Sequence, residues 1–380
     1  MSLKPDLLDA LPSRGTRVVL GLSGGVDSAV AALRLVDAGC EVTAVTTRNF
    51  CFDDPPFDAA AASVSCCSQE AVDASRALSA DLGMSHVVVD ASPDFQVEVI
   101  DDYVDEYAGG RTPSPCVRCN TRVRFPTLLE FARKIDAQVV ATGHYARRAR
   151  LGDELFVARG VDPDKDQSYF LYRLSTERLE RMVMPLGDLT KPEVRALARE
   201  RGLPVADAPE SQELCFVPDG DRSRVLAGVA RAGETVDLAG NVLGEHPGIA
   251  FFTLGQRRGL GLGGGPARVV VGLDHEKNRV VVGSEEDLAR DRLVVDQWVD
   301  RDFAPGSAGL VCRTRSRHSG VPVESVDVDP ARNLPRIDLA VPDRAPAPGQ
   351  AMVLDRDGIV VGGGRLVAAS LSTAVGEMDS

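Results

Sequence analysis

The first 145 residues alternate between short apolar runs and longer stretches in which apolar residues recur every three or four positions. Val18-Val19-Leu20 is typical of a buried strand, and the run from Ala29 begins a helix that ends near Gly39. This alternation predicts a parallel sheet with helices on both faces, a doubly wound α/β fold. The other expected strands cover residues 41–46, 86–90 and 138–143, and the other expected helices cover 69–82, 95–107 and 128–135.

The pattern changes beyond residue 211. A capping box, Thr190-Lys191-Pro192-Glu193, still predicts a helix that ends at Gly202, but glycine then becomes frequent and short β runs follow at 268–273 and 279–283. From about residue 292 short alternating strands with Pro and Gly turns predict a small β-barrel or sandwich. We therefore expect a catalytic α/β domain at 1–211, a central domain at 212–288 and a C-terminal β-barrel at 289–380.

Composition favours a cytoplasmic enzyme of several domains. A chain of 380 residues, 44% of them apolar, is too long for one core. No apolar run is long enough to span a bilayer, and residues 1–14 lack the apolar centre of a signal peptide, so no membrane partner is expected. Eight cysteines are too few for a disulfide scaffold and are typical of thiols, metal ligands or catalysts.

The net charge of −13, taken alone, argues against a nucleic-acid partner. The distribution of the charge argues the other way. Residues 51–110 hold thirteen acids and a single base, Arg76, whereas residues 111–150 hold nine bases and two acids. Because a local basic stretch is what contacts phosphates, RNA stays among the expected partners.

Candidate chemistry begins at residues 21–28, GLSGGVDS, between the first strand and the first helix. Gly24 and Gly25 let the backbone approach a ligand, and the helix N-terminus favours negative charge. Asp27 would be placed to hold a metal ion on bound phosphates. The stretch is neither a Walker loop, since no lysine reaches into the turn, nor a GxGxxG fingerprint. An ordinary βα turn is the alternative, but the full SGGVDS resembles the PP-loop of the ATP pyrophosphatases.

Ligands of such sheets bind beyond the carboxyl ends of the strands. Ser23, Thr47 and Gly143 each follow or end an expected strand, so they are expected to gather around the nucleotide.

Three cysteines point to sulfur or metal chemistry. Cys116 and Cys119 form a CxxC pair in a proline-rich stretch expected to be a loop, and Cys215 lies far along the chain. A CxxC spacing lets both sulfurs face one centre: a partner thiol, zinc or an iron–sulfur cluster. Nearby Arg118, Arg122 and Arg124 would lower the pKa of Cys119. Zinc would need a fourth ligand, for which Cys66-Cys67 is a poor candidate, while Cys40, Cys51 and Cys312 fit small buried hydrophobes.

Seven motifs in order resemble the bacterial tRNA-specific 2-thiouridylases (the MnmA family), and the resemblance covers residues 16 to 366. This resemblance implies an enzyme that uses ATP to adenylate C2 of the wobble uridine of a tRNA and then replaces the oxygen with sulfur, giving 2-thiouridine, AMP and pyrophosphate. The motifs are SGGVDS at 23–28, GRTPSP…CN at 110–120, ATGHY at 141–145, KDQSYFL at 165–171, CF at 215–216, TLGQRRGLG at 253–261 and PGQ at 348–350.

The resemblance also assigns residues. ATP with Mg²⁺ would be bound by Gly21, Leu22, Ser23, Gly24, Gly25, Val26, Asp27, Ser28, Thr47 and Gly143, with Thr47 standing where many members have methionine. The tRNA, expected to be that for Lys, Glu or Gln, would contact Ser114, Pro115, Cys116, His144, Lys165, Asp166, Gln167, Arg315, Ser316 and Gln350. Ser316 stands where the family usually has an aromatic residue.

The resemblance leaves two sources of sulfur open. In the family's usual account the residue matching Cys215 carries a persulfide from a cysteine desulfurase or sulfur-relay protein, and the residue matching Cys119 is the nucleophile. A Cys119–Cys215 disulfide then remains. Many members have an aspartate where this chain has Cys116, and three thiols could instead hold a [4Fe–4S] cluster with one open iron. The count of three thiols favours the cluster.

The C-terminal strands add a candidate RNA contact. Arg313, Arg315 and Arg317 alternate, so on one strand they would share a face suited to a phosphate track. A solvated edge strand protected by charge is the alternative.

Two other functions are weighed against the thiolase. A different PP-loop ligase would lack the loop cysteine pair and Cys215. A redox-sensing tRNA-binding protein would not need the intact SGGVDS.

Overall fold

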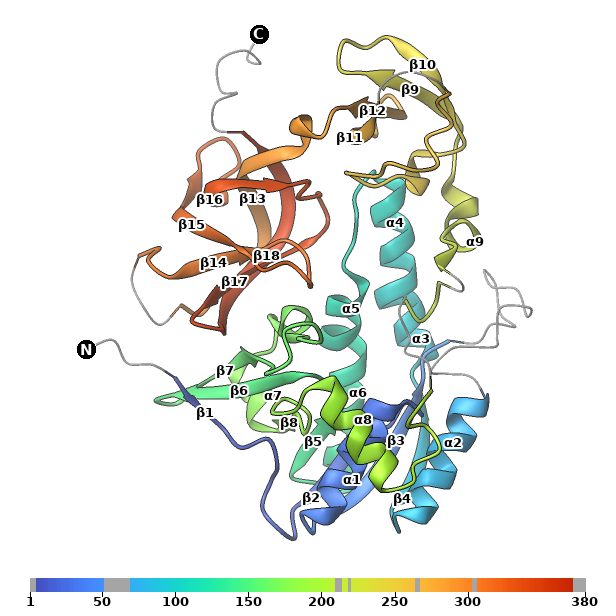
Figure 1. Ribbon diagram of the computed structural model, residues 1–380, viewed down its shortest axis with the longest axis vertical. Helices are drawn as coiled ribbons and strands as arrows, with labels where there is room; N and C mark the ends of the chain where they lie inside the picture. Colours follow the sequence, from blue (N-terminus) through green and yellow to red (C-terminus); the bar gives the residue numbers. More distant parts are fainter. Residues whose placement is uncertain are drawn as a thin grey trace. The chain divides into compact units, whose positions relative to one another are not determined.

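A computed structural model of the protein describes residues 5–50, 69–208, 214–217, 220–263, 267–302 and 306–371. The chain forms two compact units, drawn in Figure 1. Unit 1 comprises Met1–Ile100, Cys116–Asp221 and Gly358–Val360, and unit 2 comprises Asp101–Pro115, Arg222–Asp357 and Val361–Ser380. Within the described ranges, no helix is long and apolar enough to cross a bilayer.

A five-stranded parallel sheet forms the centre of unit 1 (Figure 1). Its order is β4-β3-β2-β5-β8, and every neighbouring pair is parallel, which confirms the α/β prediction. The strands are β2 Arg17–Gly21, β3 Glu41–Arg48, β4 Ser85–Asp90, β5 Val139–Thr142 and β8 Met182–Val183.

Helices cover both faces of this sheet because side chains alternate along its central strand. Val18 and Leu20 of β2 belong to a hydrophobic cluster with α1 (Val26–Asp37) and α8 (Lys191–Glu200). Val19, on the other face, lies in a cluster with α6 (Phe125–Lys134). The end of β2 and the loop that follows it are therefore held from two sides.

The predicted capping box is present at α8: Thr190 is the N-cap, and its backbone N–H donates to Glu193 Oε2 at 2.7 Å. Unit 1 has further strands and helical segments. They are β1 Asp6–Leu7, β6 Ala146–Leu151 and β7 Glu154–Arg159, which form an antiparallel ribbon, and the helical segments α2 Gln69–Asp81, α3 Ser92–Phe95, α5 Pro115–Arg118, η3 Cys119–Arg124, η4 Ser168–Leu171 and α7 Thr176–Glu180, with η2 Gln96–Asp101 at its boundary.

Unit 2 contains a four-stranded sheet and a closed barrel. The sheet has the order β10-β9-β12-β11 and encloses a cluster around Val270 and Val280. The strands of this sheet are β9 Gly233–Asp237, β10 Val242–His246, β11 Val269–Asp274 and β12 Arg279–Gly283. The helical segments of unit 2 are α4 Asp102–Ala108, α9 Ser223–Leu226, η6 Ala227–Val229, η7 Ile249–Phe251 and η8 Glu286–Leu288.

The barrel strands follow one another as β18-β13-β16-β15-β14-β17, and β17 pairs again with β18, which closes the ring. Closure removes the free edges that an open sheet would expose. This confirms the predicted barrel. Its strands are β13 Ala289–Asp300, β14 Leu310–Arg313, β15 Val321–Asp329, β16 Leu334–Arg344, β17 Ala351–Arg356 and β18 Ile359–Ser370.

Candidate active site

The loop between β2 and α1 can take only glycine at one point. Gly24 has φ +75°, and a Cβ there would lie 2.8 Å from the carbonyl oxygen of Ala71. A Cβ on Gly143, at the end of β5, would lie 3.0 Å from the backbone nitrogen of Ser28. A Cβ on Gly25, the exposed N-cap of α1, would meet Ser23 Oγ at 3.8 Å, which is ordinary contact. At Gly24 and Gly25 the loop therefore has no side chain of its own over the backbone N–H groups at the helix N-terminus, as an anion site requires.

Two serines hold the loop in shape. Ser28 Oγ accepts from the backbone N–H of Ser23 at 3.2 Å and donates to the carbonyl of Gly25 at 2.9 Å. The Ser23 and Ser28 hydroxyls also lie 3.1 Å apart. These bonds close the loop on itself, so its conformation does not depend on a ligand.

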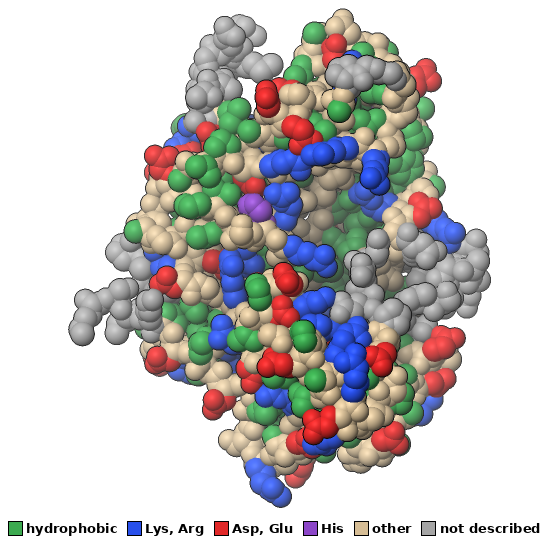
Figure 2. Space-filling model, in the orientation of Figure 1, with side chains coloured by type: hydrophobic (Ala, Val, Ile, Leu, Met, Phe, Trp, Pro, Cys, Tyr) green, Lys and Arg blue, Asp and Glu red, His purple; other side chains and the backbone are tan. Residues whose placement is uncertain are grey.

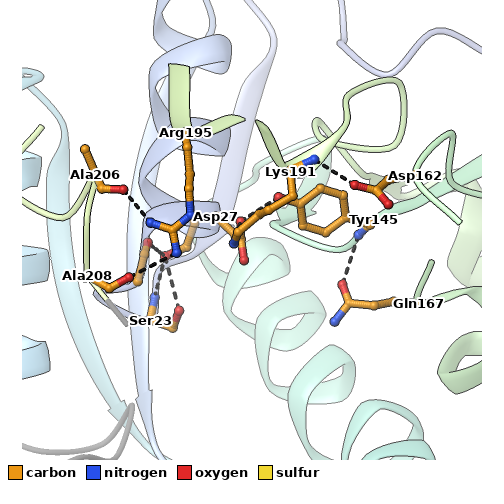
Figure 3. A network of polar contacts seen from close by, with 11 residues as sticks. Ser23, Asp27, Tyr145, Asp162, Gln167, Lys191, Arg195, Ala206 and Ala208 are labelled. Carbon is orange, nitrogen blue, oxygen red and sulfur yellow. Dashed lines mark hydrogen bonds and ion pairs between the residues drawn. The ribbon is translucent and has the colours of Figure 1, made fainter. Parts of the chain in front are cut away.

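Asp27 lies in the first turn of α1 and meets two donors from distant parts of unit 1 (Figure 3). Tyr145 Oη donates to Asp27 Oδ1 at 2.7 Å, and Lys191 Nζ lies 2.6 Å from the same oxygen. The Asp27 side chain is 36% exposed, whereas that of Lys191 is 9% exposed. The carboxylate is thus accessible, and the cation beside it is buried.

The backbones of both partners are fixed independently. The Lys191 N–H donates to Asp162 Oδ2 at 2.8 Å, and the Tyr145 N–H donates to Gln167 Oε1 at 3.0 Å, as Figure 3 shows. No lysine lies within residues 21–28, but the prediction that none reaches the turn is wrong, because Lys191 comes from a distant helix to Asp27. Lys191 was predicted only as part of a capping box, and nothing in its local sequence indicates its contact with Asp27.

The side chains present suit Mg²⁺ on a nucleotide. Mg²⁺ binds oxygen ligands and usually takes one or two carboxylates together with substrate phosphates. Asp27 offers an accessible carboxylate in the first turn of the helix that begins at the anion site. A metal ion held there would neutralise phosphate charge.

The other predicted nucleotide residues gather at the same edge of the sheet. β2, β3 and β5 are adjacent and parallel, so the positions after their carboxyl ends are neighbours. Gly143 contacts the backbone of Asp27 and Ser28, and half-buried Thr47 lies near the end of β3. Leu22 and Val26 are buried beneath the loop.

Cys116 and Cys119 lie in helical segments, not in the predicted loop. Pro115 begins α5, a position that suits its fixed φ, so Cys116 and Cys119 fall on successive helical turns. Cys116 is exposed, Cys119 is buried, and Cys215 is half-buried. Residue Phe216 packs edge-to-face on Phe95 with ring centroids 5.8 Å apart, which anchors the Cys215 segment.

The predicted metal ligands do not form a ligand group in the described ranges. Of the residues placed there, no three His, Cys, Asp or Glu side chains could hold a metal ion together. A [4Fe–4S] cluster on Cys116, Cys119 and Cys215 stays a prediction. Cys51 and Cys66-Cys67 lie outside the described residues. The prediction of a small buried thiol holds for Cys312, whose pKa is raised by burial.

His144 is buried beside the candidate site. Its Nδ1 lies 2.8 Å from Thr142 Oγ1, and its ring is 5.7 Å from the ring of Phe125. Burial, assisted by the nearby Arg124 charge, lowers the pKa of His144 to about 3. The imidazole is therefore neutral at physiological pH. The predicted contact of this residue with RNA stays a prediction.

Two predicted RNA-binding segments lie side by side in unit 2, although more than 200 residues separate them. Ser114 Oγ accepts from the Ala351 N–H at 2.9 Å, and the Thr112 N–H donates to the Pro348 carbonyl at 2.7 Å. A Cβ on Gly349 would lie 2.9 Å from the Thr112 nitrogen, so the two backbones touch. Ser114 and Gln350, both half-buried, thus share one surface of this unit.

The predicted motif 165–167 is half-buried in unit 1 and partly structural. Asp166 Oδ1 accepts from the Gly160 and Ser168 N–H groups at 3.1 Å each, and Gln167 holds Tyr145. These bonds link the motif to the residues around Asp27.

The predicted arginine track is wrong. β14 ends at Arg313, and the chain turns at 314–317, so the three arginines do not share a strand face. Arg313 is buried in an ion pair with Asp355. Arg315 is 40% exposed and lies 3.4 Å from Asp343, while Arg317 is exposed. Figure 2 shows Lys and Arg side chains mixed with acidic ones over the barrel.

Three family models match the chain: a tRNA methyl transferase HUP domain at 16–219, a tRNA methyl transferase PRC-barrel domain at 227–284 and an aminomethyltransferase beta-barrel domain at 292–366. The tRNA-specific 2-thiouridylase MnmA of Geobacter metallireducens is 44% identical over 360 residues, which cover 93% of this chain and 97% of that protein. That of Rhodospirillum rubrum is 40% identical over 371 residues, which cover 94% and 98%.

Among solved structures, a 4-thiouridine synthetase–RNA complex with bound ATP is similar with a TM-score of 0.34 and 19% identity. The match covers 53% of this chain and 45% of that one.

Proposed function

The chain belongs to the family of tRNA-specific 2-thiouridylases, and we propose that it uses ATP to convert the wobble uridine of a tRNA, position 34, into 2-thiouridine. One observation carries this proposal. The glycine loop before α1, with its uncovered helix N-terminus, and the accessible carboxylate of Asp27 form a site suited to Mg²⁺ and the phosphates of ATP. The expected acceptors are the tRNAs for Lys, Glu and Gln.

In the proposed first step the uridine O2 attacks the α-phosphorus of ATP. A bond forms between O2 and phosphorus, the bond to the bridging oxygen breaks, and pyrophosphate leaves. Loop N–H groups at Gly24 to Ser28 hold the phosphates and stabilise the charge that develops on them. Mg²⁺ on Asp27, when bound, neutralises phosphate charge. The product is an O-adenylated uridine with AMP as a good leaving group.

In the proposed second step sulfur displaces AMP from C2. The terminal sulfur of a persulfide on Cys215 attacks C2, and AMP leaves. The thiolate of Cys119 then attacks the Cys215 sulfur, which releases the 2-thiouridine and leaves a Cys119–Cys215 disulfide. A cellular thiol must reduce this disulfide before the next turnover. A cysteine desulfurase or a sulfur-relay protein would supply the persulfide.

We propose the persulfide route, with a [4Fe–4S] cluster on Cys116, Cys119 and Cys215 as the alternative source of sulfur. Anaerobic purification followed by iron analysis and thiolation assays tests this choice. Full activity without iron is expected, and activity that follows the iron content would overturn it.

The function itself is tested by pyrophosphate release from ATP with and without unmodified tRNA. Release that depends on tRNA and yields 2-thiouridine is expected. Release that ignores tRNA would favour a different PP-loop ligase.

The cysteine roles are tested by Cys119→Ser and Cys215→Ser. Each variant is expected to lose thiolation by at least about 10³-fold while ATP binding stays unchanged, because the thiols act only after adenylation. Cys312→Ser, in the barrel, is the control expected to keep thiolation. Retained 2-thiouridine in either site variant would contradict the assigned roles.

A further inference from the structure

The Lys191 side chain extends away from the backbone groups that fix the start of its helix. The start of α8 is fixed through backbone groups, by the capping box of Thr190 and Glu193 and by the bond from the Lys191 N–H to Asp162. The side chain nevertheless extends to Asp27, in the first turn of α1, and its ammonium lies 2.6 Å from Asp27 Oδ1.

The Lys191 ammonium is surrounded by groups that suit the binding of an anion. The Lys191 side chain is 9% exposed, and its ammonium lies 5.8 Å from the centre of the Tyr145 ring. Buried charges are costly unless they are paired. The position next to an accessible carboxylate at a helix N-terminus supplies a second positive centre beside the uncovered loop N–H groups.

We propose that Lys191 is a phosphate-binding residue of the ATP site and supplies the cation that the loop itself lacks. This inference rests on the proposed function. In a Walker loop the lysine lies within the loop and reaches the β- and γ-phosphates. Here the lysine comes from a helix 164 residues further along the chain.

The chemistry of lysine suits such an exchange of partners. An ammonium on a flexible four-carbon stem carries three donors that can turn to a new acceptor. In the free protein Asp27 holds Lys191, and when Asp27 faces a metal ion the ammonium turns to a phosphate oxygen. There it stabilises the negative charge that pyrophosphate gains as it leaves.

Lys191→Met and Lys191→Arg test the proposal in the full-length protein. Calorimetry with Mg²⁺ measures the binding of ATP, pyrophosphate and adenosine. For Lys191→Met we expect ATP and pyrophosphate to bind about 10-fold or more weakly and adenosine to bind unchanged, because charge-assisted bonds to phosphate are lost. Lys191→Arg keeps the charge and is expected to recover part of the affinity. Pyrophosphate release should fall about 100-fold in Lys191→Met.

A double-mutant cycle separates direct contact from an effect through Asp27. If Lys191 only neutralised Asp27, Lys191→Met would have no effect on pyrophosphate affinity in an Asp27→Asn background. We expect the loss to persist there. Arg199→Gln is the matched control, since Arg199 lies on the same helix in an exposed pair with Asp207 and should leave binding unchanged.

Three outcomes would overturn the proposal: unchanged ATP and pyrophosphate affinity, an equal loss for adenosine, or no effect in the Asp27→Asn background. If Lys191→Met does not fold, as judged by thermal denaturation, Lys191→Gln gives the same comparison. A wild-type protein that does not bind ATP at all would instead contradict the proposed function.

Discussion

Two ion pairs of this protein have similar chemistry and opposite surroundings. In unit 1, Lys191 meets Asp27 at a single oxygen, Oδ1, which it shares with Tyr145, and the carboxylate is 36% exposed. In the barrel of unit 2, Arg313 Nη2 donates to Asp355 Oδ1 at 3.1 Å and Nε lies 2.5 Å from Oδ2. The two side chains are 1% and 3% exposed. The barrel pair is buried, whereas the Asp27 carboxylate of the loop pair is partly exposed to solvent.

This difference in exposure indicates a structural role for the barrel pair and a binding role for the loop pair. The Arg313 guanidinium lies against both carboxylate oxygens, and because both side chains are buried, removing either one leaves the other as a buried charge without this partner. A lysine bound at one oxygen can exchange its acceptor without disturbing the fold. The barrel pair is therefore expected to matter for stability, and the loop pair for binding.

The largest effect is expected from breaking the barrel pair. Asp355→Asn leaves Arg313 buried without its charge partner and should lower the free energy of unfolding by about 3–5 kcal/mol. Denaturant unfolding measures the loss. Arg344→Gln, which removes an exposed pair with Glu285, is the control and should cost at most about 1 kcal/mol. Equal losses in the two variants would remove the distinction between closed and open pairs.

Breaking the loop pair should affect catalysis more than folding. Asp27→Asn removes the proposed metal ligand, so kcat/KM for pyrophosphate release should fall about 100-fold or more. The free energy of unfolding should fall by less than in Asp355→Asn, because the Asp27 carboxylate is partly solvated and the asparagine oxygen can still accept from the Lys191 ammonium. Steady-state kinetics and denaturant unfolding of the same preparation give both values. A large stability loss with normal kinetics would make the two pairs equivalent.

The loop that carries Asp27 can be tested through its glycines. Gly24→Ala must adopt φ +75° and push its Cβ against the Ala71 carbonyl, so it should destabilise the protein by about 1–3 kcal/mol. Residue 25 has φ −88°, and the methyl group of Gly25→Ala would make only an ordinary contact with Ser23 Oγ at 3.8 Å. This variant should change stability by less than about 1 kcal/mol. Its methyl group should still weaken ATP binding. Thermal denaturation and calorimetry check both variants, and equal destabilisation would contradict the geometry.

The smallest effect concerns the buried imidazole of His144. The pKa of His144 is lowered from 6.5 to about 3, so the unfolded chain binds the extra proton more readily between these values. Its contribution to stability is therefore complete above pH 6.5 and is lost as the pH falls toward 3. Linkage gives a loss of about 1.4 kcal/mol at pH 5.5.

Denaturant unfolding of the wild type and of His144→Gln at pH 7.5 and 5.5 measures this loss. His144→Gln should show a flatter pH dependence, and identical slopes for the two proteins would contradict the assignment.

The sequence predicted what depends on local pattern. Strands β2, β3, β4 and β5 of the parallel sheet, the glycine loop and the capping box at Thr190 follow from spacing and propensity within a few residues, whereas the two-residue β8 was not predicted. The contact between Lys191 and Asp27 could not be predicted, because only the packing of α8 beside α1 creates it.

Two errors also have physical causes. Prolines before Cys116 suggested a loop, but Pro115 is a helix start. The arginine alternation from Arg313 continued past the true end of β14, because the turn at 314–317 carries no glycine or proline.

The passage of the chain between its two units has a consequence for biosynthesis. Unit 1 includes Gly358–Val360, and Ile359 forms a strand pair with Ala158 that a ribosome synthesises about 200 residues later. At about 5–20 residues per second, β7 emerges roughly 10–40 s before this partner exists. During that interval a nascent chain lacks the partner that pairs with β7 at Ala158. A message truncated before codon 358 would leave both units incomplete.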